Sequence, residues 1–575
     1  MRSKVTSSPD ETLEVIVGKI EKTSPRTNDV ESPKQPEDER ATDRDGFNEQ
    51  RYLAAFPDIA EAVKSGVWAS AREHYFEHGR QEARLSHPQY LSAFPSGDSL
   101  AFPAGEIDAV FVSHNGWCLI IGWISDEAKP LRALAWVEKN EIVGTTTHFA
   151  RCRREDAEDV VKPSFGKLLG FWTVFHSEQA MSFSEPAHYR LWAGNECKTF
   201  QISPRQVDDR QLREKALEYL GSSHYFSNPQ MEAFLQLQRG LGNILIDYNM
   251  EISNEIVRAA HVVRFGAEIR QLNGSIIVCL FGKAEFLFLQ ASLFSGCPEA
   301  ESYEFIYVSN SPELAEQLLK EATMANRVYG VSITLVILPS NAGFGAANNA
   351  AVAQARSNRI LIVNPDVLPR DRDWAIKHNA VVGDLPAEQT AIFGVPLYYD
   401  DGSLMHSGMY FDLDTAVSIH YAQIEPYEIL RVEHYAKGAP SETPAFLKSR
   451  QVPAVTGAFI SIDRAWFEAL GGFSPEYIFG HYEDADLCLK SLQRGVPVWV
   501  HPVPFWHLEG KGSSRHPWHE GGSMVNRWHF TVTWKDFITD GLVGRSPVRL
   551  APARPRKPKE RPSPGPASEQ GASIC

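Results

Sequence analysis

The chain has 575 residues, of which 43% are hydrophobic and 22% charged, a composition typical of a globular protein with several domains. Its net charge of -15 argues against a protein that binds nucleic acid, because phosphate backbones are held mainly by clustered Lys and Arg. No uncharged apolar run is long enough to cross a bilayer, so we expect a cytoplasmic protein.

The first segments are polar and then helical in pattern. Residues 1–46 are rich in Pro, Asp, Glu and Ser, which predicts a disordered leader. In residues 47–95 apolar side chains recur at helical spacing around one Gly, which predicts a small helical module. Its His74 and His78 stand four apart, a spacing that can bind metal, but no third ligand accompanies them. Packing histidines are the favoured interpretation.

The next segments change from strand patterns to helix patterns. Residues 104–204 hold short alternating runs bounded by Gly, Asn and Asp, which predicts an antiparallel β-sandwich. We expect Trp117, Trp123 and Trp172 in its core, with a carbohydrate-binding platform as the alternative. Residues 205–270 carry helix formers at apolar spacing, which predicts a helical connector.

From residue 271 onward strands alternate with helices, which predicts an α/β domain with a doubly wound parallel sheet. The predicted strands are 275–281, 304–309, 333–338 and 359–364. Ligands bind beyond the carboxyl ends of such strands, here at 281–283, 309–311, 341–345 and 364–366. The tail, residues 541–575, is basic and Pro-rich, so we predict disorder. Contact of this tail with an anionic membrane surface and a plain solubilising role both stay open.

The turn NAGFGAANNA, residues 341–350, has two interpretations. Gly343 and Gly345 match the first two glycines of a GxGxxG dinucleotide fingerprint, and Asp366 arrives where a ribose-binding acid is expected. Asn348, however, replaces the third glycine, which that motif needs for close helix packing. An NAD-dependent oxidoreductase is therefore one hypothesis, and it leaves a second cluster of charged residues unexplained.

That cluster is GHYEDADLCLKSLQRG, residues 480–495. Glu483, Asp484 and Asp486 place three carboxylates within four residues at a predicted helix start, where negative charge compensates the helix dipole. Mutual repulsion and partial burial would instead raise one carboxyl pKa and favour a proton acceptor. His507, downstream at a strand end, fits a packing role or a metal ligand equally well.

The combined motifs resemble the family 2 glycosyltransferases with a GT-A fold, in particular their rhamnosyltransferase-like and galactofuranosyltransferase-like branches. The motifs are NAGFGAANNA, LIVNPDVLPRD, TGAFISIDRAWFEALGGFSPEYIFGHYEDADLCLKSLQRG and FWHLEGKGS. They extend over about residues 271–540. The helical and β-sandwich modules resemble accessory domains of bacterial glycosyltransferases more loosely.

The resemblance implies a metal site for the donor diphosphate. Asp366 of the NPD motif would bind the divalent cation, with Asn364 as a supporting contact and His507 completing the shell. An oxygen-rich site with one imidazole suits Mn²⁺ or Mg²⁺. The motif at 510–513 would close over the phosphates, with Lys511 as a contact.

The resemblance also implies roles for the ED motif and for the turn. Asp484 is the implied general base, with Glu483 as the second candidate, and Asp486 would orient the helix start or bind the acceptor. The turn would carry the donor nucleotide on Asn341, Gly343, Phe344, Gly345 and Asn348. One departure affects the donor site, because Ser309 and Asn310 stand where the family usually has acids.

The function so implied is inverting transfer of a hexosyl or deoxyhexosyl group from a nucleotide-sugar to a glycan or lipid-linked glycan. Cell-surface polysaccharide synthesis is the expected process, in the cytoplasm or at the inner face of the membrane. A non-catalytic carbohydrate-binding protein that kept the GT-A shell is the third hypothesis.

Overall fold

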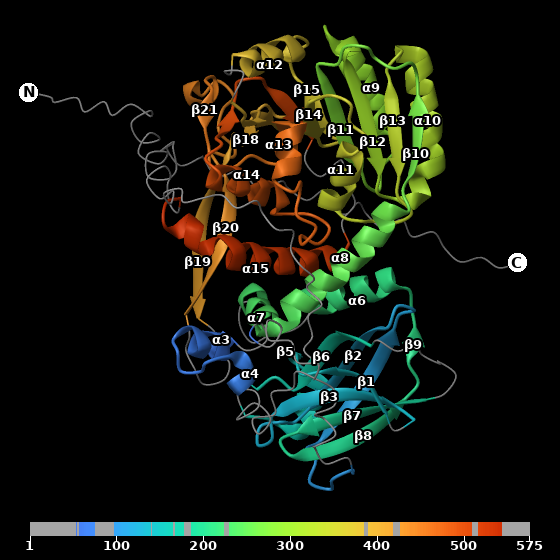
Figure 1. The fold of residues 1–575 in the computed structure, drawn as a ribbon, viewed down its shortest axis with the longest axis vertical. Helices are drawn as coiled ribbons and strands as arrows, with labels where there is room; N and C mark the ends of the chain where they lie inside the picture. The colour runs from blue at the N-terminus through green and yellow to red at the C-terminus, as the bar shows by residue number, and fades with distance from the viewer. Residues whose placement is uncertain are drawn as a thin grey trace, which may run out of the picture.

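The computed structural model describes residues 53, 57–74, 97–139, 141–164, 167–177, 186–222, 229–384, 389–417, 426–508 and 516–542. The predicted leader, the tail beyond residue 542, His78 and the motif at 510–513 lie outside these residues. Figure 1 shows a β-sheet module at the bottom, a larger α/β module at the top, and several helices between them.

Two sheets pack face to face in the lower module (Figure 1). In the described residues one sheet has the order β5-β6-β2-β1-β9 and the other the order β4-β3-β7-β8. Their strands are β1 (Gly105–Val112), β2 (Trp117–Ile124), β3 (Leu131–Glu138), β4 (Glu141–Thr146), β5 (Ala150–Cys152), β6 (Gly170–His176), β7 (Ala187–Ala193), β8 (Glu196–Ile202) and β9 (Arg205–Gln206). A short helix, α5 (Glu155–Val161), follows β5.

Helices join this module to the larger one. The connector consists of α6 (Asp209–Ser222), α7 (Pro229–Gln236) and α8 (Gly242–Arg258), and α15 (Trp518–Thr539) packs against them from the far end of the chain. A π-helical turn separates α7 from α8, where Gly240 has φ +104°. Near the N-terminus lie α3 (Pro57–Lys64) and α4 (Ala71–His74), in which His74 is buried against Trp68.

The β-module and the connector share one hydrophobic core. Side chains alternate between the two faces of a strand, so Ile120 of β2 faces the space between the sheets and Ile121 faces the helices. Trp117 and Trp172 are buried on the helix side, and Trp117 stacks on Tyr248 of α8 with ring centroids 4.2 Å apart. Both tryptophans therefore contribute to packing, in line with the interpretation that the sequence favours.

A mixed sheet forms the centre of the upper module. In the described residues its order is β10-β13-β12-β11-β14-β22-β16-β23-β21. The four predicted strands are confirmed as β11 (Gly274–Leu280), β12 (Tyr303–Ser309), β13 (Ile333–Ile337) and β14 (Arg359–Val363), and neighbours among them pair in parallel. β22 (Phe459–Asp463) pairs antiparallel with β14. The sheet is therefore mixed, whereas the sequence predicted a parallel one.

One part of the predicted helical connector is wrong. Residues His261–Phe265 form the edge strand β10, which pairs antiparallel with β13. The β-branched residues Val262 and Val263 suit a half-buried strand. Their hydrogen-bond partners come from β13, which is distant in the sequence.

Shorter elements complete the upper module. The strands are β15 (Val367–Pro369), β16 (Ile392–Gly394), β17 (Leu397–Tyr398), β18 (Leu404–His406), β19 (Met409–Val417), β20 (Pro426–His434), β21 (Arg450–Gln451), β23 (Val498–Val500) and β24 (Phe505–His507). The helices are α9 (Phe286–Ser295), α10 (Ala315–Tyr329), α11 (Phe344–Val352), α12 (Trp374–Gly383), α13 (Arg464–Ala469) and α14 (Glu483–Gln493).

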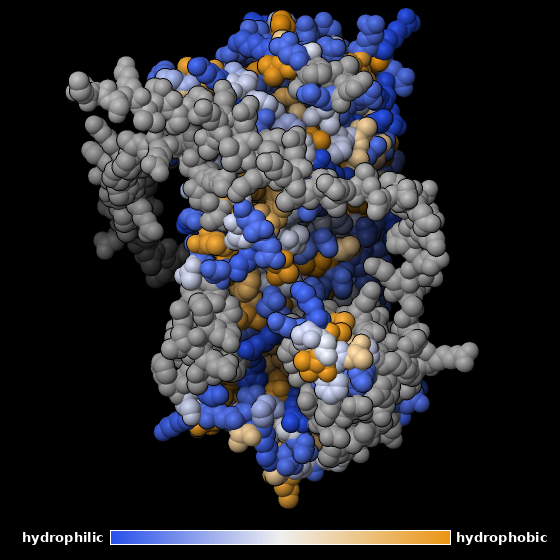
Figure 2. Space-filling model, turned by 60° about the vertical axis from the view of Figure 1, so that its left-hand side comes forward, coloured by the Kyte–Doolittle hydropathy of each residue, from blue (hydrophilic) through white to orange (hydrophobic). Residues whose placement is uncertain are grey.

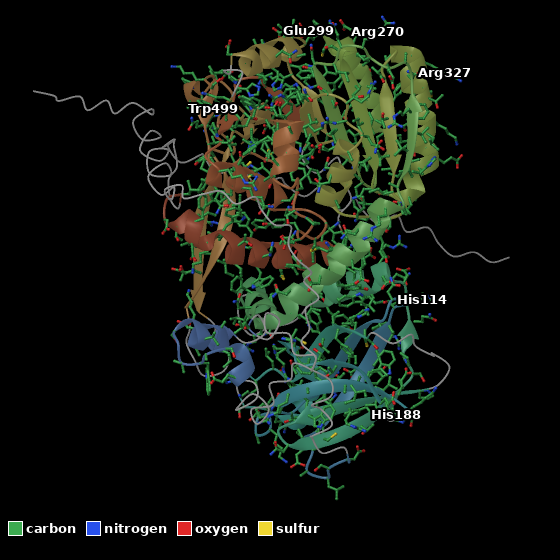
Figure 3. The ribbon with its side chains drawn as sticks, viewed as in Figure 1. His114, His188, Arg270, Glu299, Arg327 and Trp499 are labelled. Carbon is green, nitrogen blue, oxygen red and sulfur yellow. The ribbon has the colours of Figure 1, made fainter. Side chains whose placement is uncertain are left out.

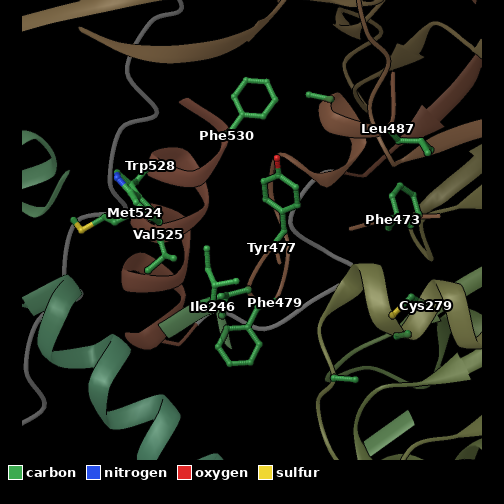
Figure 4. Close-up of a cluster of buried hydrophobic side chains, with 14 of the residues drawn as sticks. Ile246, Cys279, Phe473, Tyr477, Phe479, Leu487, Met524, Val525, Trp528 and Phe530 are labelled. Atoms are coloured by element: carbon green, nitrogen blue, oxygen red, sulfur yellow. The ribbon is translucent and has the colours of Figure 1, made fainter. Parts of the chain in front are cut away.

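The carboxyl ends of the parallel strands face the connecting helices. Arg270, just before β11, lies at the top of Figure 3 with Glu299, so β11 and its parallel neighbours run downward toward α8 and α15. Figure 4 shows the core at this junction. Ile246 of α8 and Val525 of α15 lie close there to Phe479, which belongs to the segment before α14.

On the face shown in Figure 2, hydrophilic and hydrophobic side chains of the described residues are mixed. Scattered apolar side chains of this kind are usual on protein surfaces. Within the described ranges, we find no helix whose length and apolar character would let it span a bilayer.

Candidate functional site

A cleft of about 920 Å³ opens where the carboxyl ends of β11, β12 and β14 meet α15. This volume is in the range of small-ligand sites, which typically measure roughly 300 to 1,000 Å³. The cleft is lined by residues from both of the motif regions that the sequence singles out. Its predicted members are Asn310, Asn341, Phe344, Asn364, Asp366, Glu483, Asp484 and His507.

The turn before α11 is closed by side-chain amides. The backbone N–H of Ala342 donates to Asn310 Oδ1 at 2.8 Å, and that of Gly343 donates to Asn341 Oδ1 at 2.9 Å. The amide of Asn310 also donates to Asn341 Oδ1 at 2.8 Å. Two of the N–H groups that would have been candidates for phosphate binding are therefore already satisfied inside the protein.

The next N–H of the turn is also engaged, because Phe344 donates to the carbonyl of Phe479 at 2.6 Å. Gly343 has φ +89°, and a Cβ there would lie 3.1 Å from the Phe479 Cα. Gly345 likewise packs against Phe473. The two glycines thus allow close approach of the segment that precedes the ED motif.

Three of the predicted donor-binding residues of the turn do not line the cleft. Gly343 and Gly345 are not among the residues that line the cleft, and Asn348 is fully buried with its amide donating to the Phe344 carbonyl. A dinucleotide fingerprint needs free N–H groups at the helix start. The engaged N–H groups of residues 342–344 therefore weigh against that interpretation.

Arg213 of α6 supports the same turn from the connector, a role that the sequence does not signal. Its guanidinium donates to the Asn341 carbonyl at 3.1 Å and to Asn249 Oδ1 at 2.9 Å. It also lies over the Phe479 ring, 4.4 Å from the centroid. Burial lowers the pKa of Arg213 to about 10, which leaves it charged at neutral pH. The connector therefore belongs structurally to the cleft.

Antiparallel pairing brings Asp366 and His507 together across 140 residues of chain. Val367 of β15 faces His507 of β24, and Leu508 N–H donates to the Asp366 carbonyl at 3.0 Å. The Asp366 Oδ1 and His507 Nε2 atoms are 3.4 Å apart, and both side chains are more than nine-tenths buried. Asn364 stands at the end of β14, where its backbone N–H donates to the Ala458 carbonyl at 2.9 Å.

The Asp366–His507 pair is compatible with one divalent cation. Adjacent ligands of an octahedral Mg²⁺ at about 2.1 Å lie roughly 3 Å from each other, close to the separation of these two atoms. The described residues hold no group of three His, Cys, Asp or Glu side chains placed for a metal. Such an ion would need oxygens from a ligand or from water, as Mg²⁺ bound to substrate phosphates usually has.

Glu483 and Asp484 begin α14 and face the same cleft in different ways. Asp484 is half-buried, and its two oxygens accept N–H groups of Gly457 and Ala485 at 2.7 and 2.8 Å. Glu483 is buried, and its Oε2 has no hydrogen-bond partner in the described residues. Burial raises the pKa of both carboxyls, and the Asp484 charge raises that of Glu483 further, to about 8.

The backbone that leads into this pair is strained. Phe479, His481 and Tyr482 have φ values of 60°, 84° and 76°. Residues other than glycine rarely adopt this backbone conformation, which costs roughly 1 to 3 kcal/mol for each residue. Asn526 of α15 holds the segment, because it accepts the Ile478 N–H at 2.7 Å and donates to neighbouring carbonyls. Strain of this kind concentrates at functional sites.

Two other predicted site residues are not brought to the cleft. Ser309 is fully buried, and its hydroxyl donates to the Ser311 carbonyl at 3.0 Å. Asp486 is buried on the far side of α14, where it accepts Trp534 Nε1 at 2.9 Å and pairs with Lys490 at 2.6 Å. This placement does not suit acceptor binding. Lys511 lies outside the described residues.

An aromatic rim joins Phe281, which lies in the predicted 281–283 segment, to rings near the start of α15 that the sequence analysis did not single out. Phe281, at the end of β11, lines the cleft with His516 and His519, whose ring centroids are 6.4 and 6.1 Å from the Phe281 ring. Phe479 packs against Trp518 between them, with centroids 4.4 Å apart. The run HPWHE, residues 516–520, could have signalled this part of the rim, because it concentrates aromatic and imidazole rings.

Comparison with known proteins gives partial likenesses. No protein-family model matches the chain. It is 30% identical over 210 residues to "Uncharacterized protein y4gI" of Sinorhizobium fredii (strain NBRC 101917 / NGR234), a match that covers 36% of this chain and 21% of that protein. The chain thus spans about a fifth of the length of the curated relative it matches.

Two solved glycosyltransferase structures resemble part of the fold. One is GalNAc-T7 with UDP, GalNAc and Mn²⁺, at 14% identity and a TM-score of 0.34, covering 47% of this chain and 50% of that chain. The other is the mannosyltransferase PcManGT from Pyrobaculum calidifontis with GDP-Man and Mn²⁺, at 13% identity and a TM-score of 0.30, covering 55% and 83%. Both TM-scores are low, so the case for a function rests on the residues of the cleft.

Proposed function

We propose that this chain is an inverting, metal-dependent glycosyltransferase that moves a sugar from a nucleotide-diphosphate donor to a hydroxyl of a glycan or lipid-linked glycan. The observation that carries the proposal is that one cleft holds both the Asp366–His507 pair and the Glu483–Asp484 pair. A dinucleotide site would need free N–H groups in this turn, and those of residues 342–344 are engaged within the protein.

The donor would lie along the strand ends. Asn310, Asn341 and Asn364 line that wall. Since the Asn310 and Asn341 side-chain oxygens already hold the turn, the Asn341 amide nitrogen and the Asn364 side chain would contact ribose and phosphate. Asp366 and His507 would hold the cation. A divalent cation there would neutralise charge on the departing diphosphate.

Asp484 would act as the general base. The acceptor oxygen attacks the anomeric carbon from the side opposite the diphosphate, and its proton passes to Asp484. The new C–O bond forms as the bond between the anomeric carbon and the phosphate oxygen breaks. The electron pair of the broken bond leaves with the nucleoside diphosphate, and the configuration at the anomeric carbon inverts. Gly457 and Ala485 hold the Asp484 carboxylate in place, and the raised pKa of Glu483 favours its neutral form beside Asp484.

A carbohydrate-binding protein without activity is the alternative, and it has no need of a base beside a metal pair. The test is thermal unfolding of the purified chain with UDP-, dTDP- and GDP-sugars and with NAD(H), each with and without Mn²⁺. We expect one nucleotide-sugar class to stabilise the protein only with Mn²⁺, and Asp366→Ala to abolish that effect. Stabilisation by NAD(H) without metal, and by no sugar nucleotide, would refute the proposal.

Turnover separates the enzyme from the binder. Asp484→Asn should retain donor binding and lose release of nucleoside diphosphate in the presence of acceptor, by roughly 10²- to 10⁴-fold, the usual contribution of a positioned base. Equal release by the wild type and Asp484→Asn would point to the binding protein.

A further inference from the structure

A second cavity adjoins the cleft on the side away from the donor wall. It measures about 90 Å³ and lies between α7, the β19–β20 hairpin and α15. Glu520 and Ser523 line both spaces, so the two lie beside each other along one helix. Tyr482, the residue directly before the Glu483–Asp484 pair, forms part of the cavity wall.

One face of α15 forms the floor of this passage. Residues 520, 523, 524, 527 and 528 recur at spacings of three and four, which places them on a single side of a helix. Figure 4 shows Met524 and Trp528 projecting from the side of α15 that faces away from Tyr477. A ligand that lies along this face of α15 would contact residues of both the cleft and the cavity.

The cavity walls combine aromatic rings with fixed polar groups. Phe234 and Trp528 supply apolar faces, and Trp528 is held by a hydrogen bond from Nε1 to Gln238 Oε1 at 2.9 Å. Arg527 is held by the Leu430 carbonyl at 2.9 Å and by Asp414. Aromatic faces beside polar groups match the apolar ring faces and equatorial hydroxyls of a sugar.

We propose that this cavity is an acceptor subsite that binds the second sugar of a glycan whose terminal sugar lies beside Asp484. The inference rests on the proposed function and makes the substrate class more specific, namely acceptors with at least two sugar units. The volume of about 90 Å³ is smaller than the roughly 150 Å³ of a cavity that holds benzene, so the cavity would take one edge of a sugar unit whose remainder lies in the adjoining cleft. The donor residues Asn310 and Asn341 line the opposite end of the cleft and not this cavity.

The test is binding of the fluorescently labelled full chain to an array of bacterial mono-, di- and oligosaccharides, with UDP or GDP and Mn²⁺ present. We expect binding to glycans of two or more units and at least tenfold weaker binding to monosaccharides. Phe234→Ala and Glu520→Gln should each weaken binding to the longer glycans at least fivefold. Glu520 is exposed, so its substitution leaves the fold unaffected. Val532→Ala, at an exposed position of the same helix, is the matched control and should bind as the wild type does.

Two results would overturn the inference. One is binding that does not depend on the second sugar or on Phe234 and Glu520, and the other is no binding to any glycan on the array. Asp484→Asn distinguishes the two proposals, because it should keep array binding while losing turnover. Glycan binding that needs Phe234, without nucleotide-sugar stabilisation, would support the subsite and refute the transferase. Stabilisation by a nucleotide-sugar without binding to any glycan on the array would support the transferase and refute the subsite.

Discussion

Replacement of Gly343 by Ala tests whether the turn before α11 is built for close packing. The backbone at Gly343 has φ +89° and ψ 162°, a region open essentially to Gly alone, and forcing Ala into it costs roughly 1 to 3 kcal/mol. The new Cβ would lie 3.1 Å from the Phe479 Cα, and the hydrogen bond from Phe344 to Phe479 prevents the two segments from separating freely. Overpacking of this kind adds roughly 1 kcal/mol or more.

We therefore expect Gly343→Ala to lose about 3 kcal/mol of stability, which corresponds to a fall of about 6 °C in the melting temperature of a domain of this size. Gly402→Ala is the matched control. Gly402 also has a positive φ, +78°, but a Cβ there meets no atom within 4 Å, so only the conformational cost of about 1 kcal/mol remains.

Thermal unfolding of the two variants provides the assay, with nucleotide-sugar affinity as the second readout. Displacement of Phe479 would move the strained segment that leads to Glu483, so Gly343→Ala should also weaken donor-dependent turnover. Equal losses of stability in the two variants would refute the packing argument, because the clash with Phe479 would then add nothing to the conformational cost.

Three further predictions concern buried ionisable side chains. Burial and the neighbouring Asp484 raise the pKa of Glu483, so Glu483→Gln, which mimics the neutral acid, should keep turnover within threefold at pH 7 while Asp484→Asn loses it. The pH-rate profile should differ between the wild type and Glu483→Gln on its alkaline side, and identical profiles would contradict this assignment. Burial lowers the pKa of His501 from 6.5 to about 4 and that of its neighbour His378 well below 6.5, so the unfolded chain binds more protons below pH 6.5. Stability is then complete above pH 6.5 and falls by roughly 3 kcal/mol for His501 toward pH 4, a decline in melting temperature that His501→Gln should lessen. Arg213→Lys keeps the charge and loses the paired donors, so it should weaken nucleotide-sugar affinity severalfold; unchanged affinity would show that the connector does not support the turn.

Local sequence patterns were sufficient for the parallel strands. The runs that became β11 to β14 are apolar on both faces, because Ile276 faces one side of the sheet and Ile277 the other, with helices packed on each. The same patterns indicated the strand-to-helix turn at Gly343. Edge strand β10 was missed because its pairing partner lies more than sixty residues further along the chain.

The sequence by itself determined which chemistry was present, namely carboxylates, amides and an imidazole in motifs that follow strand ends. Only the tertiary structure decided which of them meet. Asp484 and Asp486 are two residues apart on one helix, hence about 200° around its axis, so one faces the cleft and the other faces Trp534. Asp366 and His507 meet because β15 and β24 pair across 140 residues, and Arg213 reaches the turn from a helix outside the sheet. Such contacts depend on long-range packing, which no local pattern encodes.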